Sequence, residues 1–226
     1  MDNLRPTFIS ACSPKVNHKT WIFDLDDTLH HASGGIFEHI NQLMTRYMVQ
    51  HLGINEDEAT ALRSRYWAQY GATMHGLSTN HGIDPQHFLI ETHPLEVLEQ
   101  WLQFEEQLAE SLASLPGRKI ILSNGPQHYV EGILERMRIQ HHFESVYGVE
   151  RLNYIPKPHL DAFHTVLGKE GLDPARCIMV EDSLPNLLTA KELGMTTIWV
   201  SHELRKPAHV DHRVEKISQL SRLPLN

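Results

Sequence analysis

Short runs of apolar and β-branched residues recur along this chain, and helical patterns separate the later ones. The runs cover residues 20–25, 119–123, 145–149, 177–180 and 196–200, and a short edge strand is expected at 212–214. Near-continuous apolar runs of this length are typical of strands that are buried on both faces of a parallel sheet. The alternation of such runs with helices therefore predicts an α/β fold with right-handed crossovers.

Helix signals support this alternation. Residues 127–137 and 185–193 each begin next to a proline, and the second stretch is followed by Gly194, which is the usual order of helix start and stop signals. Leu160, Phe163 and Leu167 share one face of a helix predicted at 159–167, and Gly168 is expected near its end.

The segment between the first two strands, residues 25–118, is far longer than a crossover between parallel strands requires. It carries helical patterns at 36–51 and 56–70, which indicate an all-helical insert. We place this insert at residues 33–103 and the α/β core at residues 1–32 and 104–226. A helix at 104–115 is expected to lead the chain back to the sheet.

Composition and charge exclude several classes of protein. Hydrophobic residues make up 41% of the chain and charged residues 21%, as in globular proteins with a real core. A net charge of −8 argues against nucleic acids and anionic membranes as partners. No apolar run approaches the ~20 residues of a membrane span, and residues 1–14 lack the apolar stretch of a secretory signal, so a cytoplasmic location is expected. Two cysteines are too few for a disulfide framework or a zinc cluster.

Polar residues follow the strands directly, at the edge where open α/β sheets bind ligands. Asp24 and Asp26 stand one residue apart, so that one carboxylate could attack as a nucleophile while the other moves a proton. Ser123 and Asn124 offer a hydroxyl and backbone N–H groups that suit phosphate oxygens. The sequence thus places phosphate-handling groups after two strands.

Two more groups complete this set. Lys157 stands between two prolines and carries a compact cation that suits a phosphate. Glu181 and Asp182 follow a buried strand and are the hard oxygen ligands that Mg²⁺ prefers. Taken singly, the four groups have ordinary explanations as an acidic turn or helix cap, a Ser-Asn-Gly-Pro turn, a solvated lysine and acidic residues at a helix start. Their shared position at strand ends favours one site instead.

Taken in order, Asp24-x-Asp26-x-Thr28, Ser123, Lys157 and Glu181-Asp182 resemble the four motifs of the haloacid dehalogenase superfamily of phosphatases. The resemblance spans nearly the whole chain and implies a Rossmann-like parallel sheet with an all-helical cap inserted after the first motif. It implies that Asp24 is the nucleophile and Asp26 the general acid and base. It also implies that Thr28, Ser123, Asn124 and Lys157 bind phosphate, and that Asp24, the backbone carbonyl of Asp26 and Asp182 hold Mg²⁺, with Glu181 nearby.

A finer resemblance, to the pyrimidine 5′-nucleotidase branch, lies in residues 70–77 and in Glu181-Asp182-Ser183-x-x-Asn186. It implies a Mg²⁺-dependent hydrolase of pyrimidine nucleoside 5′-monophosphates that acts through an aspartyl phosphate. The glycines within residues 70–77 fit a helix-breaking turn without any ligand equally well. Selectivity for the leaving group is expected from cap side chains, namely Thr73, His75 and His93.

The charges of the predicted site explain why it needs a metal. Asp24, Glu181 and Asp182 carry three negative charges against the one positive charge of Lys157, if Asp26 starts protonated. A divalent cation neutralises the remainder, so that an anionic phosphate can approach. This reasoning requires the carboxyl groups of Asp24 and Asp182 to share one coordination shell.

Other functions stay open at this point. The expected partner is a small phosphate monoester, and a phosphatase of sugar phosphates or other small phosphometabolites fits the same motifs. A phosphomutase would combine these motifs with a different cap. A non-catalytic binding protein is the least favoured, because it would have no reason to retain all four motifs. The chain lacks a GxxxxGK[ST] loop, which argues against a P-loop ATPase or kinase.

Overall fold

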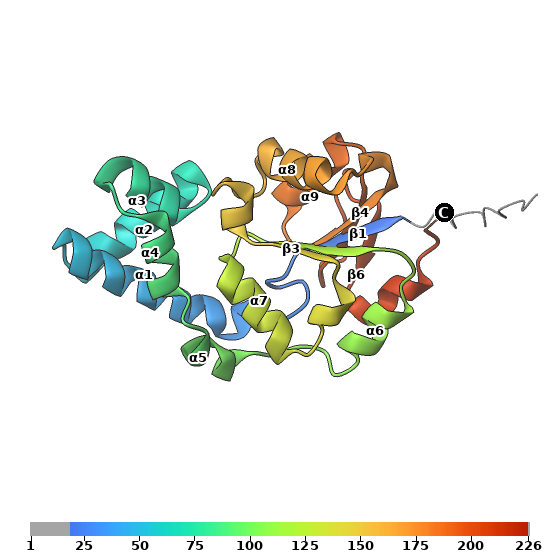
Figure 1. The fold of residues 1–226 in the computed structure, drawn as a ribbon, viewed down its shortest axis with the longest axis horizontal. Coiled ribbons are helices and arrows are strands. Elements are labelled where there is room, and N and C mark those ends of the chain that lie inside the picture. Colours follow the sequence, from blue (N-terminus) through green and yellow to red (C-terminus); the bar gives the residue numbers. More distant parts are fainter. Residues whose placement is uncertain (1–18, 226) are drawn as a thin grey trace, which may run out of the picture.

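A parallel β-sheet forms the centre of the computed structural model, which describes residues 19–225 (Figure 1). The spatial order of its strands is β3-β2-β1-β4-β5-β6, and every neighbouring pair is parallel. The predicted α/β class is confirmed, and all the expected strands are present. Their bounds are β1 Thr20–Phe23, β2 Lys119–Leu122, β3 Ser145–Tyr147, β4 Cys177–Glu181, β5 Thr196–Val200 and β6 His212–Val214.

Helices fill the long segment between β1 and β2 and connect the strands that follow β2. Those between β1 and β2 are α1 Ile36–Leu52, α2 Glu56–Tyr70, α3 Thr73–His81, α4 Pro85–Thr92, α5 Leu95–Leu98 and α6 Leu108–Ser114. Those after β2 are α7 Gln127–Arg136, α8 Leu160–Glu170 and α9 Leu184–Glu192. Short 3₁₀ turns include Ala32–Gly34 and Ile217–Arg222.

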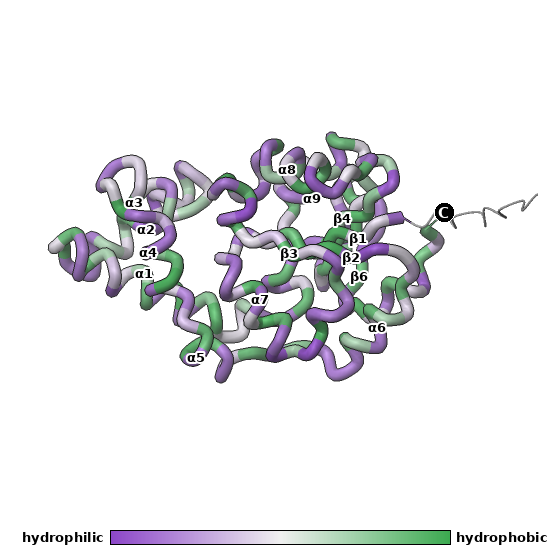
Figure 2. Tube along the Cα trace, in the orientation of Figure 1, coloured by the Kyte–Doolittle hydropathy of each residue, from purple (hydrophilic) through white to green (hydrophobic). Residues whose placement is uncertain are grey.

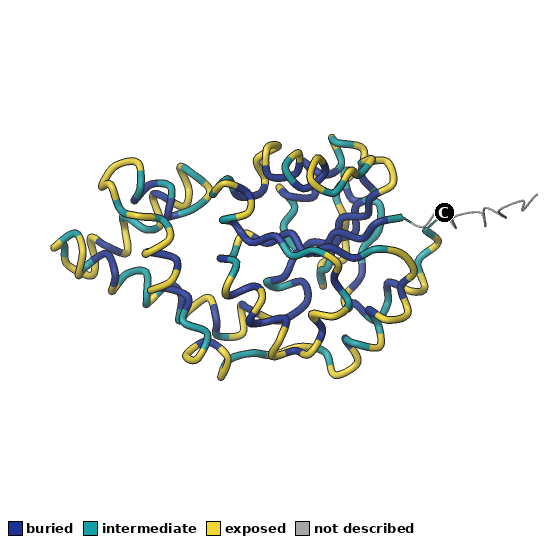
Figure 3. Tube along the Cα trace, in the orientation of Figure 1, coloured by how far each residue is buried: buried dark blue, intermediate teal, exposed yellow. Residues whose placement is uncertain are grey.

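Alternating strand residues bury against helices on the two faces of the sheet. Trp21 and Phe23 of β1 pack in one cluster with residues of α6 and α7, while Ile22 packs in another with residues of α8 and α9. Figure 1 shows these two helix layers on opposite sides of the strands. Hydrophobic residues predominate at the centre of the sheet (Figure 2), and β1, β2 and β4 are buried along their whole length (Figure 3). The continuous apolar runs of the sequence are explained by this two-sided burial.

Helices α1 to α4 lie to one side of the sheet, at the left of Figure 1. They have a separate apolar cluster that includes Tyr47, Tyr66 and Phe88. Helix α1 joins the two regions, because Ile40 in its first half belongs to the cluster of the sheet and Tyr47 further along belongs to the helical cluster. Val149, from the segment after β3, also packs into the helical cluster.

Two helices differ in length from the sequence prediction. Helix α8 passes through Gly168 and ends at Gly171, which adopts the left-handed conformation that glycine favours (φ 62°). Helix α6 begins at Leu108 and not at residue 104. Residues 102–105 before it are not helical, and they form bonds to distant segments: the Gln103 carbonyl accepts a hydrogen bond from the His31 N–H (2.7 Å) and the Glu105 carboxylate accepts one from the Ile217 N–H (2.8 Å). The first 18 residues of the predicted core lie outside the described residues.

The order of the strands determines where the polar groups meet. Strand β1 lies between β2 and β4, so the segments that follow these three strands leave the sheet side by side at their carboxyl ends. The chain moves from one side of β1 to the other between β3 and β4, and open α/β sheets bind ligands at such a switch point.

Candidate active site

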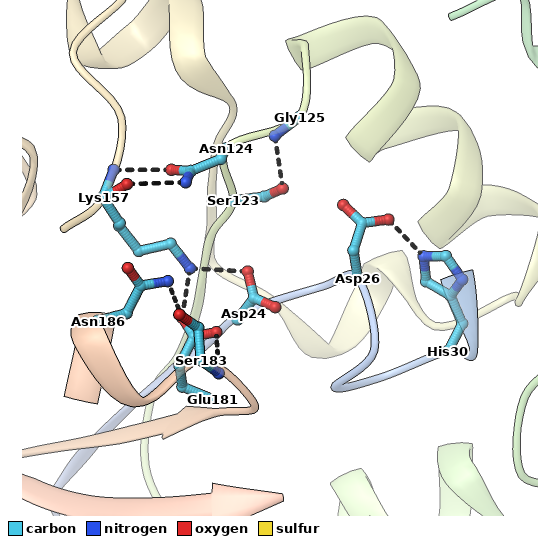
Figure 4. Close-up of polar contacts among 10 residues, drawn as sticks. All are labelled: Asp24, Asp26, His30, Ser123, Asn124, Gly125, Lys157, Glu181, Ser183 and Asn186. Atoms are coloured by element: carbon cyan, nitrogen blue, oxygen red, sulfur yellow. Dashed lines mark hydrogen bonds and ion pairs between the residues drawn. The ribbon is translucent and has the colours of Figure 1, made fainter. Parts of the chain in front are cut away.

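Asp24, Lys157 and Glu181 form a buried group of charges at the carboxyl end of β1 (Figure 4). The Lys157 Nζ donates to Asp24 Oδ1 at 2.7 Å and to Glu181 Oε2 at 2.6 Å. The side chain of Lys157 is only 1% exposed. Burial alone would lower the pKa of Lys157, but the charges of the two carboxylates outweigh it and raise the pKa.

Several donors hold the Glu181 carboxylate in place. Besides Lys157, Asn186 of α9 donates from Nδ2 to Glu181 Oε2 (3.0 Å), and the Ser183 N–H donates to Oε1 (3.1 Å). Ser183 lies between β4 and α9 and Asn186 lies in the first turn of α9, so the residues that directly follow the strand support its carboxylate. Glu181 thereby fixes Lys157 beside Asp24.

Asp24, Glu181 and Asp182 each place a carboxylate oxygen within 4.8 Å of the others. The carboxyl groups of Asp24 and Asp182 are therefore close enough to bind the same metal ion, as the predicted site requires. Burial and the Glu181 charge raise the pKa of Asp24, and burial with the Asp24 and Glu181 charges raises that of Asp182. Hard oxygen ligands whose negative charges exceed the neighbouring positive charge fit a divalent cation such as Mg²⁺.

The segment after β2 places Ser123 and Asn124 beside Lys157 (Figure 4). Ser123 is fully buried and its Oγ accepts the Gly125 N–H (2.9 Å), which leaves the hydroxyl proton available to a ligand. The Asn124 side chain is bonded to the Lys157 backbone in both directions: Nδ2 donates to the carbonyl (2.9 Å) and Oδ1 accepts from the N–H (2.7 Å). The side chain of Asn124 thus positions Lys157, and only the backbone of Asn124 is available for the predicted contact with phosphate.

Thr28 lies in the tight turn that follows β1, where the Leu25 carbonyl accepts backbone N–H groups from three successive residues, including Thr28. The hydroxyl of Thr28 is buried and has no hydrogen-bond partner within residues 19–225. Its predicted role as a phosphate-binding residue stays a prediction.

Asp26 lies apart from the Lys157 group and has partners of its own (Figure 4). His30 Nε2 lies 3.0 Å from Asp26 Oδ1, and the Tyr129 hydroxyl donates to the same oxygen at 2.6 Å. Burial raises the pKa of Asp26, but the hydrogen bond and charge of His30 and the Tyr129 hydroxyl outweigh it and lower the pKa. Two donors therefore stabilise the Asp26 anion in the ligand-free protein, and the expectation that Asp26 starts the reaction protonated stays a prediction.

The three predicted selectivity residues lie in different surroundings. Thr73 donates to the Arg63 carbonyl (3.3 Å), and His75 Nε2 lies 2.6 Å from the Tyr154 carbonyl oxygen, so both side chains are engaged with backbone. His93 is the one near Asp26: its ring centroid lies 5.7 Å from that of Tyr129. Burial lowers the pKa of His93 to about 4.

A cavity of about 660 Å³ opens between α1 and α2. Its walls include Ser33, Asn41, Arg46 and Arg63, and none of the three predicted selectivity residues lines it. Ser33 is bonded through its backbone N–H to Asp27 (2.8 Å) in the turn after β1. The cavity therefore begins next to the segment that carries Asp24 and Asp26.

His30 and Tyr129 carry no signal in the sequence that predicts their bonds to Asp26. Tyr129 lies 103 positions from Asp26 along the chain, and no spacing rule links the two residues. His30 stands four residues after Asp26, but the adjacent His31 has the same chemistry, so only the structure distinguishes the histidine that bonds to Asp26.

Comparison with known proteins places this geometry in a family. Residues 21–200 match the family model described as haloacid dehalogenase-like hydrolase. The chain belongs to this family. The match includes both strands that border β1 and all of the segments that supply the candidate site.

Individual relatives of this haloacid dehalogenase-like hydrolase are distant. Phosphate metabolism protein 8 of Saccharomyces cerevisiae is 25% identical over 202 residues, which cover 80% of this chain and 61% of that protein. Hexitol phosphatase B of Escherichia coli is 30% identical over 80 residues, 35% of this chain and 36% of that protein. Phosphoglycolate phosphatase of Yersinia pestis is 23% identical over 192 residues, 80% of this chain and 79% of that protein. The chain thus spans less than two thirds of the length of the first two relatives.

Solved structures share the fold. A HAD phosphatase from Thermococcus onnurineus superposes with a TM-score of 0.66 at 21% identity, covering 90% of this chain and 96% of that one. The L-2-haloacid dehalogenase of Xanthobacter autotrophicus gives a TM-score of 0.59 at 18% identity, with 91% and 97% covered. At these identities the likeness establishes the architecture alone. Within residues 19–225, no helix has the length and apolar character needed to cross a membrane.

Proposed function

We propose that this hydrolase is a Mg²⁺-dependent phosphate monoester phosphatase that works through an aspartyl phosphate on Asp24. The observation that carries the proposal is the convergence of Lys157 Nζ on Asp24 and Glu181, with Asp182 in the same cluster of carboxylates. One buried cation and an excess of carboxylates at a strand end are what an anionic phosphate and a divalent metal would need together.

In the first step, a carboxylate oxygen of Asp24 attacks phosphorus and the bond from phosphorus to the leaving oxygen breaks. Lys157 and the Ser123 hydroxyl hold phosphoryl oxygens, and Asp26 gives a proton to the leaving alcohol. In the second step, Asp26 takes a proton from water as the water attacks phosphorus, and Asp24 is released. Asp24, Asp182 and the backbone carbonyl of Asp26 would hold Mg²⁺, with Glu181 nearby, and the cation would supply positive charge that offsets the charge of the phosphate.

We further propose that residues 33–103 act as a cap domain on a core formed by residues 1–32 and 104–226. The separate apolar cluster of α1 to α4 supports this division. A cap that closes over Asp24 would exclude bulk water while the aspartyl phosphate forms. Ser123 and Lys157 would contact only the phosphate, so cap side chains would select the leaving group. Of the three predicted selectivity residues, His93 lies nearest to Asp26, because its ring packs against Tyr129.

For the substrate, we propose a pyrimidine nucleoside 5′-monophosphate. The proposal is supported by residues 70–77 and by Glu181-Asp182-Ser183-x-x-Asn186, whose asparagine bonds directly to Glu181. Sugar phosphates or other small phosphometabolites are the second candidate, favoured by the names of relatives such as Hexitol phosphatase B and Phosphoglycolate phosphatase.

Phosphate release from a panel of esters tests both levels of the proposal. The panel contains UMP, CMP, AMP, GMP, a hexitol phosphate and phosphoglycolate, each assayed with Mg²⁺ and with excess EDTA. We expect Mg²⁺-dependent turnover, with the two pyrimidine nucleotides preferred. Preference for the hexitol phosphate or phosphoglycolate would replace the pyrimidine assignment, and full activity in EDTA would contradict the metal-dependent site.

The nucleophile is tested with Asp24→Asn, which keeps the shape of the side chain but removes its nucleophilic charge. We expect turnover to fall by several orders of magnitude, because the covalent step is lost. Asp173→Asn is a matched control, since Asp173 bonds to the Ala175 N–H in a turn that precedes the amino end of β4, whereas the candidate site follows the carboxyl end of that strand. A rate for Asp24→Asn near that of the control would exclude Asp24 as the nucleophile.

A further inference from the structure

Two donors from distant parts of the chain bond to one oxygen of the Asp26 carboxyl. His30 Nε2 lies 3.0 Å from Oδ1, and the Tyr129 hydroxyl lies 2.6 Å from it. Within residues 19–225, no hydrogen bond to the second oxygen, Oδ2, is formed. The two oxygens of this carboxyl are therefore in different environments.

Both donors are held firmly. The side chain of His30 has no exposed surface, and its backbone N–H points to the Leu25 carbonyl (3.4 Å) in the turn that carries Asp26. Tyr129 is 1% exposed in the first turn of α7, and its ring packs against His93. Burial and the neighbouring Asp26 raise the pKa of Tyr129, so its hydroxyl keeps its proton and acts as a donor.

Such an arrangement orients a carboxyl group. Two donors that converge on Oδ1 restrict rotation of the carboxyl plane and stabilise charge on that oxygen. A proton that Asp26 carries is then placed on Oδ2, which has no competing donor. Catalysis by a general acid depends on this kind of alignment, because the proton must lie within hydrogen-bond reach of the leaving oxygen.

We infer that His30 and Tyr129 are positioning residues that hold Asp26 by Oδ1 and reserve Oδ2 for proton exchange with the leaving alcohol and the attacking water. The inference rests on the proposed phosphatase function. As the Asp24 oxygen bonds to phosphorus, the electron pair of the breaking bond goes to the leaving oxygen, which takes the proton from Oδ2. The attacking water later returns a proton to Oδ2 as the bond between Asp24 and phosphorus breaks.

Leaving groups of different basicity separate this role from a merely structural one. The alkoxide of UMP or of ribose 5-phosphate needs a proton as it departs, whereas the phenolate of p-nitrophenyl phosphate is stable without one. We therefore compare kcat/KM, which reports phosphoryl transfer to Asp24, for these three esters. Asp26→Asn sets the benchmark, with a loss of ~10²–10⁴-fold for the alkyl esters, the usual worth of general acid catalysis.

For Tyr129→Phe, which removes only the hydroxyl, we expect kcat/KM to fall by ~10–100-fold with the alkyl esters and by less than about threefold with p-nitrophenyl phosphate. His30→Leu should show the same contrast, and His30→Gln, which retains an N–H donor, should recover much of the loss. Tyr66→Phe is the matched control, because the Tyr66 hydroxyl is also bonded to a histidine Nε2 (His81, 2.8 Å) but lies among the cap helices.

The outcomes separate this inference from the proposed function on which it rests. Equal losses of kcat/KM with alkyl and aryl esters, or no loss in Tyr129→Phe and His30→Leu, would overturn the positioning role. Activity of the wild-type protein towards these esters would still support the proposed phosphatase function. If Asp26→Asn itself fails to discriminate between the esters, Asp26 is not the acid and the inference falls with that assignment. A wild-type protein inert towards all three esters and the nucleotide panel would refute the proposed function itself.

Discussion

Replacement of Asp182 by asparagine should stabilise the metal-free protein while it removes one ligand of the proposed metal site. Asp182 lies within 4.8 Å of carboxylate oxygens on both Asp24 and Glu181. At that separation and an effective dielectric constant of ~20, each repulsion between like charges is worth ~3.5 kcal/mol. Attraction to Lys157 offsets part of the total, so Asp182→Asn should gain about 2–3 kcal/mol, or roughly 5–10 °C in Tm for a chain of this size.

The gain should depend on pH, and the pKa shift of Asp182 sets its sign. Because the folded pKa lies above the unfolded value, the destabilisation is absent below the unfolded pKa and grows as the pH rises towards the folded pKa. In EDTA, urea unfolding should therefore show a clear advantage of Asp182→Asn at about pH 8 and little difference at about pH 4.

Addition of Mg²⁺ should reverse the order of stability. Wild-type protein gains stability by binding the cation in its native state alone, whereas Asp182→Asn has lost a ligand and gains little. Asp173→Asn serves again as the control for an Asp-to-Asn change away from the cluster. A variant that is less stable than wild type in EDTA at pH 8, or whose advantage is the same at all pH values, would refute the repulsion on which this reasoning depends.

Three further substitutions test other parts of the structure. Gly76→Ala would place a Cβ 2.1 Å from the Tyr66 ring, so urea unfolding should show a loss of ~1–3 kcal/mol. Unchanged stability would mean that α2 and α3 can move apart at no cost. Asn124→Ala removes both bonds to the Lys157 backbone and should lower kcat/KM for phosphate esters about tenfold without changing Tm by more than a few degrees; an unchanged kcat/KM would show that Lys157 needs no such support. Burial alone would raise the pKa of Asp211, but hydrogen bonds and the Lys191 ammonium group lower it. Asp211 therefore stabilises the fold above its unfolded pKa, and this stabilisation is lost on acidification. In urea unfolding, Asp211→Asn should cost ~0.5–1 kcal/mol near pH 7 and nothing at about pH 2, and a cost that does not change with pH would contradict the ion pair.

The sheet could be predicted because its signal is local. Residues such as Ile22 and Phe23 are both buried, on opposite faces, so the apolar run needs no knowledge of the rest of the fold. Helix ends were less predictable, since both Gly168 and Gly171 are able to end α8 and only the packed structure selects the second. The segment before α6 bonds through the Gln103 carbonyl to His31, which is far away in sequence.

The position of the candidate site could also be predicted, because Asp24, Ser123 and Asp182 directly follow strands whose order in the sheet brings them together. The direction of a side chain after that point is a tertiary property. Asn124 has a donor and an acceptor that suit a phosphate or a backbone equally, and it bonds to Lys157 because residues 123–125 and 157 lie side by side (Figure 4). Position along the chain therefore located the site without assigning what each polar group binds.

The hydrogen bonds to Asp26 show most clearly what a count of charges along the sequence misses. A count of carboxylates and lysines treats a neutral tyrosine as irrelevant, yet the Tyr129 hydroxyl is the shortest bond that Asp26 makes within residues 19–225. Tyr129 is placed by α7, and α7 packs against α5 at the end of the proposed cap, where Leu95 lies over Gly132. The orientation of Asp26, the proposed acid, thus depends on α7, the helix that also contacts α5 of the proposed cap. A residue chosen from the motif alone supplies the carboxyl group, while the surrounding fold determines which of its oxygens is free to carry a proton.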